Sequence, residues 1–282
     1  MTGPYHRYVA LGDSQTEGLN DGDDQVGVRG WADRFADHLA GSTSPDLTYA
    51  NLALRGCRAR HVHDVQLPAA LALEPDLASV VVGMNDLLRH DYDLDETVGA
   101  VERTFAALRA TGCRVVTTTF PDVSLMLPVM GWLRPREERL IGSLREAADR
   151  HDVEVLDLFH LDLGGDPSMW SHDRIHGSSV GHQRIAAGMA HLLGLPGSDP
   201  GWAEASVPQW STARLVAREA HWLATFMVPF LVRQVRGRGP GATAAAKRPE
   251  LVRVLAAEVD GGFETGAERL PQPTERLVEE GR

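Results

Sequence analysis

Cysteine and lysine are scarce in this chain of 282 residues. The two cysteines, Cys57 and Cys113, are too few for a disulfide framework and show no metal-ligand spacing. Lys247 is the only lysine, so arginine supplies almost all the positive charge. The formal net charge is −11 and the pI is near 5.5. A protein that binds nucleic-acid phosphates usually carries a basic face, so we predict no nucleic-acid partner.

Long apolar runs are also missing. A membrane-spanning helix needs about 18 apolar residues, and the nearest run, WLATFMVPFLV at residues 222–232, is shorter. The N-terminal segment MTGPYHRYVALGDS lacks the apolar core of a secretory signal. We therefore predict no transmembrane segment and, if the chain is complete, a cytoplasmic location.

Short β-branched runs alternate with longer amphipathic stretches, a pattern typical of βαβ units. We expect strands at residues 7–11, 47–52, 78–82, 114–119 and 154–158, and helices at 30–40, 63–73, 94–110, 135–151 and 179–193. This order predicts an α/β fold, a three-layer α/β/α sandwich with a five-stranded, mainly parallel sheet. Reactive groups are then expected at the carboxyl edge of the sheet.

The sequence changes in character after residue 195. Residues 1–195 are predicted to form one α/β/α domain, and residues 196–238 a C-terminal helical extension with a long helix at 212–236, interrupted at Pro229. Residues 239–282 are predicted to hold a linker, a short helix at 248–259 and a flexible tail. The helix at 212–236 has three possible roles: packing on the domain, pairing of two subunits, or contact with a membrane surface.

Four junctions between expected strands and loops carry polar groups or glycine. Ser14 follows the first strand in VALGDSQTEG, Gly56 closes NLALRG, Asn85 lies in VVGMND, and Asp173 precedes His176 by three residues in SHDRIHGSSVGH. Each residue could instead have a purely structural role. Ser14 or Asp13 could cap a helix, Gly56 could allow a turn, and the Asn85 side chain could hold its loop. Their occurrence together favours one acyl-transfer site.

Together these blocks resemble the SGNH hydrolase superfamily, the GDSL-type esterases and lipases, over residues 7–195. The resemblance implies a flavodoxin-like fold and a metal-independent, cofactor-free hydrolase. Gln15 stands where the family's GDSL nickname has leucine, and Gly177 follows the histidine where many members have proline. In the α/β-hydrolase alternative, the nucleophile lies in G-x-S-x-G and the acid and base lie on separate loops, which this sequence does not match.

The resemblance implies a role for each residue. Ser14 attacks the ester, His176 takes its proton, and Asp173 orients the imidazole. The Ser14 and Gly56 backbone N–H groups and the Asn85 side-chain amide form the oxyanion hole. His172 has no acid at the matching offset, and His182 is expected inside the following helix. HVHD at residues 61–64 misses the common metal-ligand spacings, so we predict no metal site.

The predicted function is hydrolysis of a small-molecule acyl ester, including acetylated sugars and lipids, through an acyl-serine intermediate. The acyl pocket is expected at Met84, Met126, Met130, Trp132 and Ile175, although the loop after the fourth strand could equally be core. Two alternatives remain open. One is a catalytically silent module that binds acyl or glycan groups, and the other is a thioesterase or lysophospholipase that contacts membranes through residues 212–236.

Overall fold

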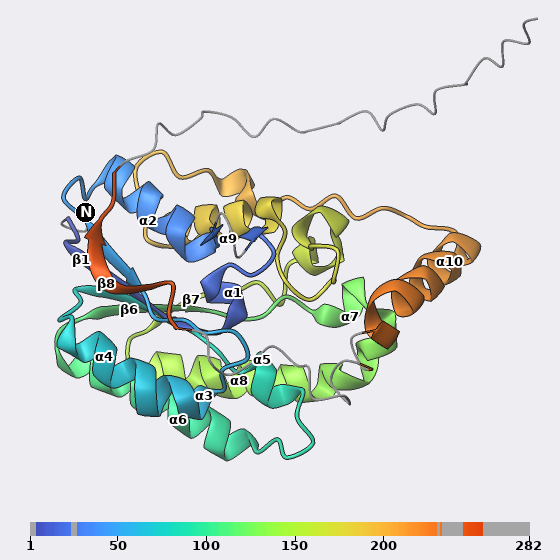
Figure 1. Ribbon diagram of the computed structural model, residues 1–282, viewed down its shortest axis with the longest axis horizontal. Helices are drawn as coiled ribbons and strands as arrows, with labels where there is room; N and C mark the ends of the chain where they lie inside the picture. Colours follow the sequence, from blue (N-terminus) through green and yellow to red (C-terminus); the bar gives the residue numbers. More distant parts are fainter. Residues whose placement is uncertain (1–3, 24–26, 230–231, 233–244, 256–282) are drawn as a thin grey trace, which may run out of the picture.

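A six-stranded sheet forms the centre of the molecule. The computed structural model describes residues 4–23, 27–229, 232 and 245–255 (Figure 1). The strand order is β7-β6-β5-β1-β4-β8, and the first five strands in this order run parallel. Their bounds are β1 Arg7–Gly12, β4 Thr48–Asn51, β5 Leu77–Val81, β6 Arg114–Thr118, β7 Glu154–Leu156 and β8 Arg248–Arg253. The predicted α/β class and parallel sheet are confirmed.

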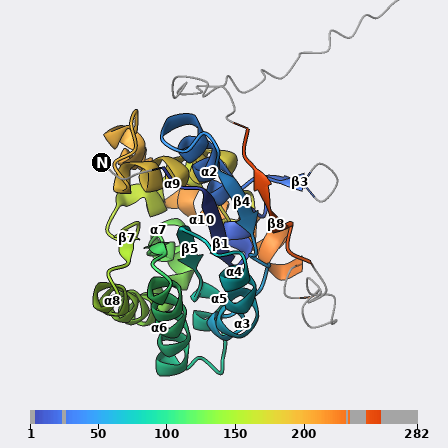
Figure 2. The same ribbon diagram turned by 90° about the vertical axis from the view of Figure 1, so that its left-hand side faces the viewer.

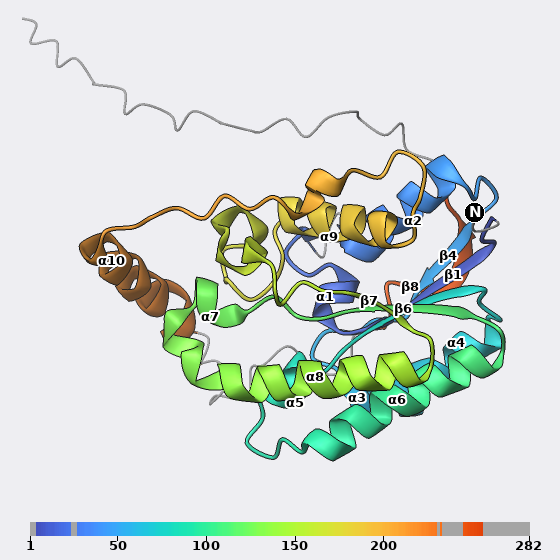
Figure 3. The ribbon, with the colours of Figure 1, turned by 180° about the vertical axis from the view of Figure 1, so that it is seen from behind.

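Alternating residues of β1 explain the three layers. Tyr8 and Ala10 belong to the core on one face of the sheet, and Val9 and Leu11 to the core on the other. Since successive side chains of a strand point to opposite faces, a strand buried on both sides is apolar throughout. One face is covered by α2 (Trp31–Ser42) and α9 (Ser179–Leu192). The opposite face is covered by helices that lie together in Figures 1 and 3: α3 Ala59–His61, the π-helical turn η1 Val62–Gln66, α4 Leu67–Ala72, α6 Leu94–Ala110 and α8 Arg134–Arg150.

Several short elements connect the longer helices and strands. Strands β2 (Gly22–Asp23) and β3 (Gly27–Val28) form a small antiparallel pair. The helical turns are α1 Ser14–Glu17, α5 Met84–Leu87, α7 Val123–Met126, η2 Pro128–Leu133, η3 Asp162–Gly165, η4 Pro167–Met169 and η5 Pro200–Ala203. The five longer helices expected from the sequence are confirmed, with ends displaced by up to four residues. Within the described ranges, no helix is long and apolar enough to cross a membrane.

The sixth strand corrects two expectations. The sheet has six strands rather than five, and residues 248–253, predicted to begin a short helix, form β8 instead. Strand β8 pairs antiparallel with the edge of β4 (Figure 2). An unpaired sheet edge offers a row of backbone donors and acceptors, and pairing with it overrides a weak helix propensity. Pro249 is tolerated because β8 is itself an edge strand. Residues 254 and 255 are not helical, and the end of the predicted helix, residues 256–259, lies outside the described residues.

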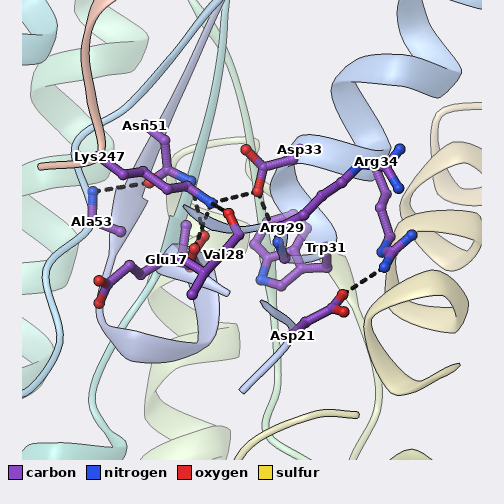
Figure 4. Close-up of polar contacts among 12 residues, drawn as sticks. Glu17, Asp21, Val28, Arg29, Trp31, Asp33, Arg34, Asn51, Ala53 and Lys247 are labelled. Carbon is purple, nitrogen blue, oxygen red and sulfur yellow. Dashed lines mark hydrogen bonds and ion pairs between the residues drawn. The ribbon is translucent and has the colours of Figure 1, made fainter. Parts of the chain in front are cut away.

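The only lysine fastens the segment that enters β8. Lys247 Nζ donates hydrogen bonds to the backbone carbonyls of Glu17 and Val28 and forms an ion pair with the Asp33 carboxylate (Figure 4). Glu17 is the last residue of α1, and Asp33 lies in the first turn of α2. A chain segment more than 200 residues downstream is therefore bound next to the helical turn that begins with Ser14.

A long helix lies at the opposite end of the molecule from β8 (Figure 1). Helix α10 (Thr212–Trp222) continues through the π-helical turn η6 (Leu223–Met227), and residues 228 and 229 are also helical. The predicted helix at 212–236 is thus confirmed as far as residue 229. Its predicted interruption at Pro229 stays a prediction, because residues 230 and 231 lie outside the described residues. Pro229 has no backbone N–H, so the carbonyl of residue 225 cannot accept the usual helical hydrogen bond from it. The π-helical turn η6 lies just before Pro229 and accommodates the missing bond.

Candidate active site

The structure brings Ser14, His176 and Asp173 together. Ser14 is the first residue of α1, two residues beyond the end of β1, and the His176 loop precedes α9. His176 Nε2 lies 2.9 Å from Ser14 Oγ, and His176 Nδ1 lies 2.6 Å from Asp173 Oδ2. A hydroxyl, an imidazole and a carboxylate in this order can lower the barrier to attack, because the ring takes the proton while the carboxylate stabilises the resulting cation.

The helix cap at this junction is Asp13 and not Ser14. The Asp13 side chain accepts a hydrogen bond of 3.1 Å from the backbone N–H of Gln15. Asp13 is almost completely buried, and this burial raises the pKa of its carboxyl to about 6, although the Gln15 N–H and His176 act in the opposite direction. Because Asp13 fills the capping role, the Ser14 hydroxyl is left to contact His176.

The Asp173 carboxylate is surrounded by donors. Asn20 Nδ2 donates to Asp173 Oδ2 at 2.7 Å, and Ser171 Oγ donates to Oδ1 at 2.8 Å. The backbone N–H groups of Ile175 and His176 also donate to Oδ1, each at 2.9 Å. Burial alone raises the pKa of this carboxyl, but the hydrogen bond and charge of His176 together with the backbone donors lower it well below the ordinary value. Asp173 is therefore held as an anion.

The predicted oxyanion residues lie around the same junction. Gly56 has φ +77°, in the left-handed region that favours glycine, and an added Cβ would meet nothing within 4 Å. The glycine is thus needed for backbone conformation and not for space. In the part of the chain that the structure describes, neither the Ser14 nor the Gly56 backbone N–H donates to a protein acceptor. Both groups can point to a bound oxygen atom.

Asn85 is in a different state. Its Nδ2 donates to Asp13 Oδ2 at 3.2 Å and to the Cys57 carbonyl at 3.0 Å. An amide nitrogen carries two hydrogens, so both are directed to protein acceptors. Asn85 lies beside Asp13 and the Gly56 loop, as its predicted role requires. To bind an oxyanion, its amide must exchange one of these bonds.

The five apolar pocket candidates lie in different environments. Met126 is buried and packs with half-buried Met130, whereas Trp132 is 64% exposed. Met84 is half-buried against the main core, and Ile175 is half-buried beside His176. Met126 and Met130 thus belong to one apolar cluster, and Trp132 lies outside it.

A cavity of about 620 Å³ adjoins the oxyanion side of the site. It is lined by Gly56 and Cys57, and by charged side chains that include Arg58, Arg60 and Asp86. The charges are paired: Arg58 contacts Asp86 and Arg60 contacts Asp64. None of the five apolar candidates lines this cavity. Leu54 and Val65 also line it, so the cavity offers both charged groups and apolar surface to a ligand.

Sequence reasoning missed two residues that hold the acid–base loop, residues 171–177. Gln15 Nε2 donates to the Ile175 carbonyl at 2.7 Å, and the Gly177 N–H donates to Gln15 Oε1 at 3.3 Å. Gln15 thus binds the backbone on both sides of His176. Its departure from the family's leucine was a visible signal. Asn20, the donor to Asp173, has no signal of this kind in the sequence.

The other histidines occupy separate places. His182 lies inside α9, as expected, and is buried; its Nδ1 accepts the Trp31 N–H at 3.2 Å. Burial lowers the pKa of His182 to about 4, so its ring is neutral near pH 7. His172 is exposed, and His63 pairs with the adjacent Asp64. Among the described residues there is no group of three side chains able to hold a metal ion.

The comparison with protein families matches residues 10–184 to the GDSL-like lipase/acylhydrolase family. The chain belongs to this family. The matched segment contains all the candidate site residues and covers more than half of the chain. As a GDSL-like acylhydrolase, the chain is a carboxylic ester hydrolase. A comparison with curated proteins found no match.

Solved structures with a similar fold include three esterases or hydrolases. LAE5, an α/β hydrolase from the metagenome of Lake Arreo in Spain, is 21% identical, with 68% of this chain and 97% of that chain covered and a TM-score of 0.57. Axe2, an acetylxylan esterase from Geobacillus stearothermophilus, is 16% identical, with 73% and 99% covered and a TM-score of 0.57. The esterase EstA from Pseudoalteromonas is 17% identical, with 67% and 96% covered and a TM-score of 0.52. At this identity the likeness establishes the fold.

Proposed function

We propose that this acylhydrolase cleaves carboxylic esters through an acyl-Ser14 intermediate. The observation that carries the proposal is the continuous hydrogen-bonded series from Ser14 Oγ through His176 to Asp173. His176 accepts the Ser14 proton during attack and delivers it to the leaving alcohol. A water molecule then attacks the acyl-Ser14 ester while His176 accepts its proton. His176 returns this proton to Ser14 Oγ, and the carboxylic acid is released. Each step balances without a metal or cofactor.

The tetrahedral intermediate carries its charge on the former carbonyl oxygen. In this proposal the backbone N–H groups of Ser14 and Gly56 receive that oxygen, and Asn85 completes the hole when its amide turns from the Cys57 carbonyl. Donors placed before the reaction stabilise charge that develops in the transition state, and this lowers the barrier more than it strengthens ground-state binding.

We further propose a short acyl group on a hydroxylated alcohol as the substrate class. The charged cavity beside Gly56 supports this choice, since hydroxyl groups can bind to its arginine and carboxylate side chains. Axe2, which shares the fold, is named as an acetylxylan esterase. Long acyl chains would need an apolar channel, and the apolar pocket candidates do not line this cavity.

The test is hydrolysis of p-nitrophenyl esters from acetyl to palmitoyl, with acetylated xylooligosaccharides added as polyhydroxylated substrates. We expect Ser14-dependent turnover that is greatest for acetyl and falls with chain length. Turnover that is equal in Ser14→Ala and wild type contradicts the mechanism. An optimum at long chains contradicts the substrate class alone. Binding of esters or glycans without turnover identifies the silent module instead.

A further inference from the structure

Helix α10 lies against the loop that carries Asp173 and His176. Most of its side chains are exposed, but Trp222, its last residue, is only 3% exposed. The indole Nε1 of Trp222 donates a hydrogen bond of 3.2 Å to the backbone carbonyl of Asp173. A buried indole N–H needs an acceptor, so the contact fixes the ring and the peptide bond together. The C-terminal extension therefore touches the candidate acid residue directly.

Arg174, the next residue in the loop, is held by the same helix. It has φ +56°, a left-handed conformation that costs free energy in a residue with a Cβ. Its guanidinium forms an ion pair of 2.8 Å with Glu219 and lies 5.3 Å from the centre of the Trp222 ring. It also donates to the Arg218 carbonyl at 3.2 Å. These contacts offset the cost of the unusual backbone turn between Asp173 and His176.

The same end of the helix packs on a second loop at the carboxyl edge of the sheet. Trp222 forms an apolar cluster with Met126 and Leu127, and half-buried Met130, Phe226 and Met227 pack against them. Figure 3 shows α10 beside α7, the turn that contains Met126. The helix thus ties the acid–base loop to the loop that follows β6.

We propose that α10 positions the acid–base loop, with Trp222 and Glu219 as the positioning residues. By holding the Asp173 carbonyl and the Arg174 side chain, they keep His176 Nε2 within reach of Ser14 Oγ. Neither residue touches the reacting atoms. The inference rests on the proposed function, because it assigns the extension a role in that same reaction. It predicts that weakening the contacts of Trp222 and Glu219 with this loop lowers kcat and leaves KM nearly unchanged.

The decisive variant is Trp222→Phe, which keeps an aromatic ring and removes the N–H donor. We expect kcat on p-nitrophenyl acetate to fall by about 3- to 10-fold, the loss expected for one hydrogen bond that acts through another residue, with KM within twofold. The matched control is Trp210→Phe, whose ring lies against Arg214.

Glu219→Gln supplies a second, milder measurement. It removes the charge that pairs with Arg174 and leaves Trp222 in place. We expect a smaller fall in kcat, again with KM unchanged, and this variant decides the question if Trp222→Phe does not fold. A folded Trp222→Phe protein with the kcat and KM of wild type and of Trp210→Phe overturns the proposal.

The wild type and Ser14→Ala, assayed in parallel, separate the two hypotheses. If wild-type turnover does not depend on Ser14, the proposed function fails, and the role of α10 in that reaction fails with it. If turnover depends on Ser14 but is unaffected by both α10 variants, only the positioning role is wrong.

Discussion

The two sides of the candidate site are built differently. Ser14 lies two residues beyond the end of β1, a strand in the middle of the sheet that pairs with β4 and β5. His176 and Asp173 lie on a loop before α9 with little regular structure, and side chains from distant segments hold it. Gln15, Asn20 and Trp222 all bind this loop. The nucleophile side depends on the fold as a whole, and the acid–base side depends on a few individual contacts.

The pKa values of two buried carboxyl groups, Asp13 and Asp173, also differ between the two sides of the site. Asp13, beside Ser14, accepts one hydrogen bond on each carboxylate oxygen, from the Gln15 N–H and from Asn85 Nδ2, and burial raises its pKa to about 6. Asp173, beside the histidine, has donors on both oxygens, and its pKa is lowered despite burial. The difference follows from the deeper burial of Asp13 and from the charge and larger number of donors that face Asp173.

The largest fall in kcat is expected when the Ser14 hydroxyl or the His176 imidazole is removed. Ser14→Ala and His176→Ala should each lower kcat on p-nitrophenyl acetate by about 10⁴- to 10⁶-fold, and the double variant should be no worse, since the residues act as a unit. Thermal unfolding checks that the fold is kept. Exposed Ser42→Ala, at the end of α2, is the matched serine control. Additive losses in the double variant would show that the two residues act independently.

Asn85→Ala should have the next largest effect. Loss of one oxyanion donor is expected to lower kcat by about 100- to 1,000-fold, with a smaller change in KM. Asn85→Asp, of nearly the same size but without the donor hydrogens, should lose as much. The measurement is steady-state kinetics on short esters. An unchanged kcat would mean that the Asn85 amide remains on Asp13 and Cys57 throughout the reaction and serves only the structure of the nucleophile side.

The two carboxylates should give opposite pH dependences of stability. The folded-state pKa of Asp13 is raised, so its contribution is fully present below pH 3.8 and is lost as the pH rises through about 6, at most about 3 kcal/mol. The folded-state pKa of Asp173 is lowered, so its contribution is present above pH 4 and is lost as the pH falls. Urea unfolding from pH 3 to 7 should show Asp13→Asn gaining stability over wild type as pH rises. Wild type should lose its advantage over Asp173→Asn as pH falls, and parallel curves would contradict both assignments.

The difference between the two sides of the site also explains which features could be predicted from the sequence. The apolar alternation and the four motif blocks locate β1, Ser14, Gly56, Asn85, Asp173 and His176, because strand ends and loop glycines are encoded locally. Strand β8 could not be found in this way, since residues 248–253 become a strand only by pairing with the edge of β4. The contact of Trp222 with Asp173 also joins distant segments, and no local pattern marks it. Sequence reasoning therefore locates the residues that the structure brings together around Ser14, but it misses most of the contacts that hold the loop of residues 171–177.

Gln15→Leu tests that division with the smallest change. It replaces the glutamine by the residue of the family's nickname and removes both bonds to the backbone around His176. We expect kcat to fall by about 10-fold with little change in KM, because the loop loses two neutral hydrogen bonds that position the base. Gln15→Glu is the informative partner: it keeps the acceptor for the Gly177 N–H and loses the donor to the Ile175 carbonyl. An intermediate kcat means that each bond contributes, whereas wild-type kcat in Gln15→Leu means that Asn20 and Trp222 alone hold the loop.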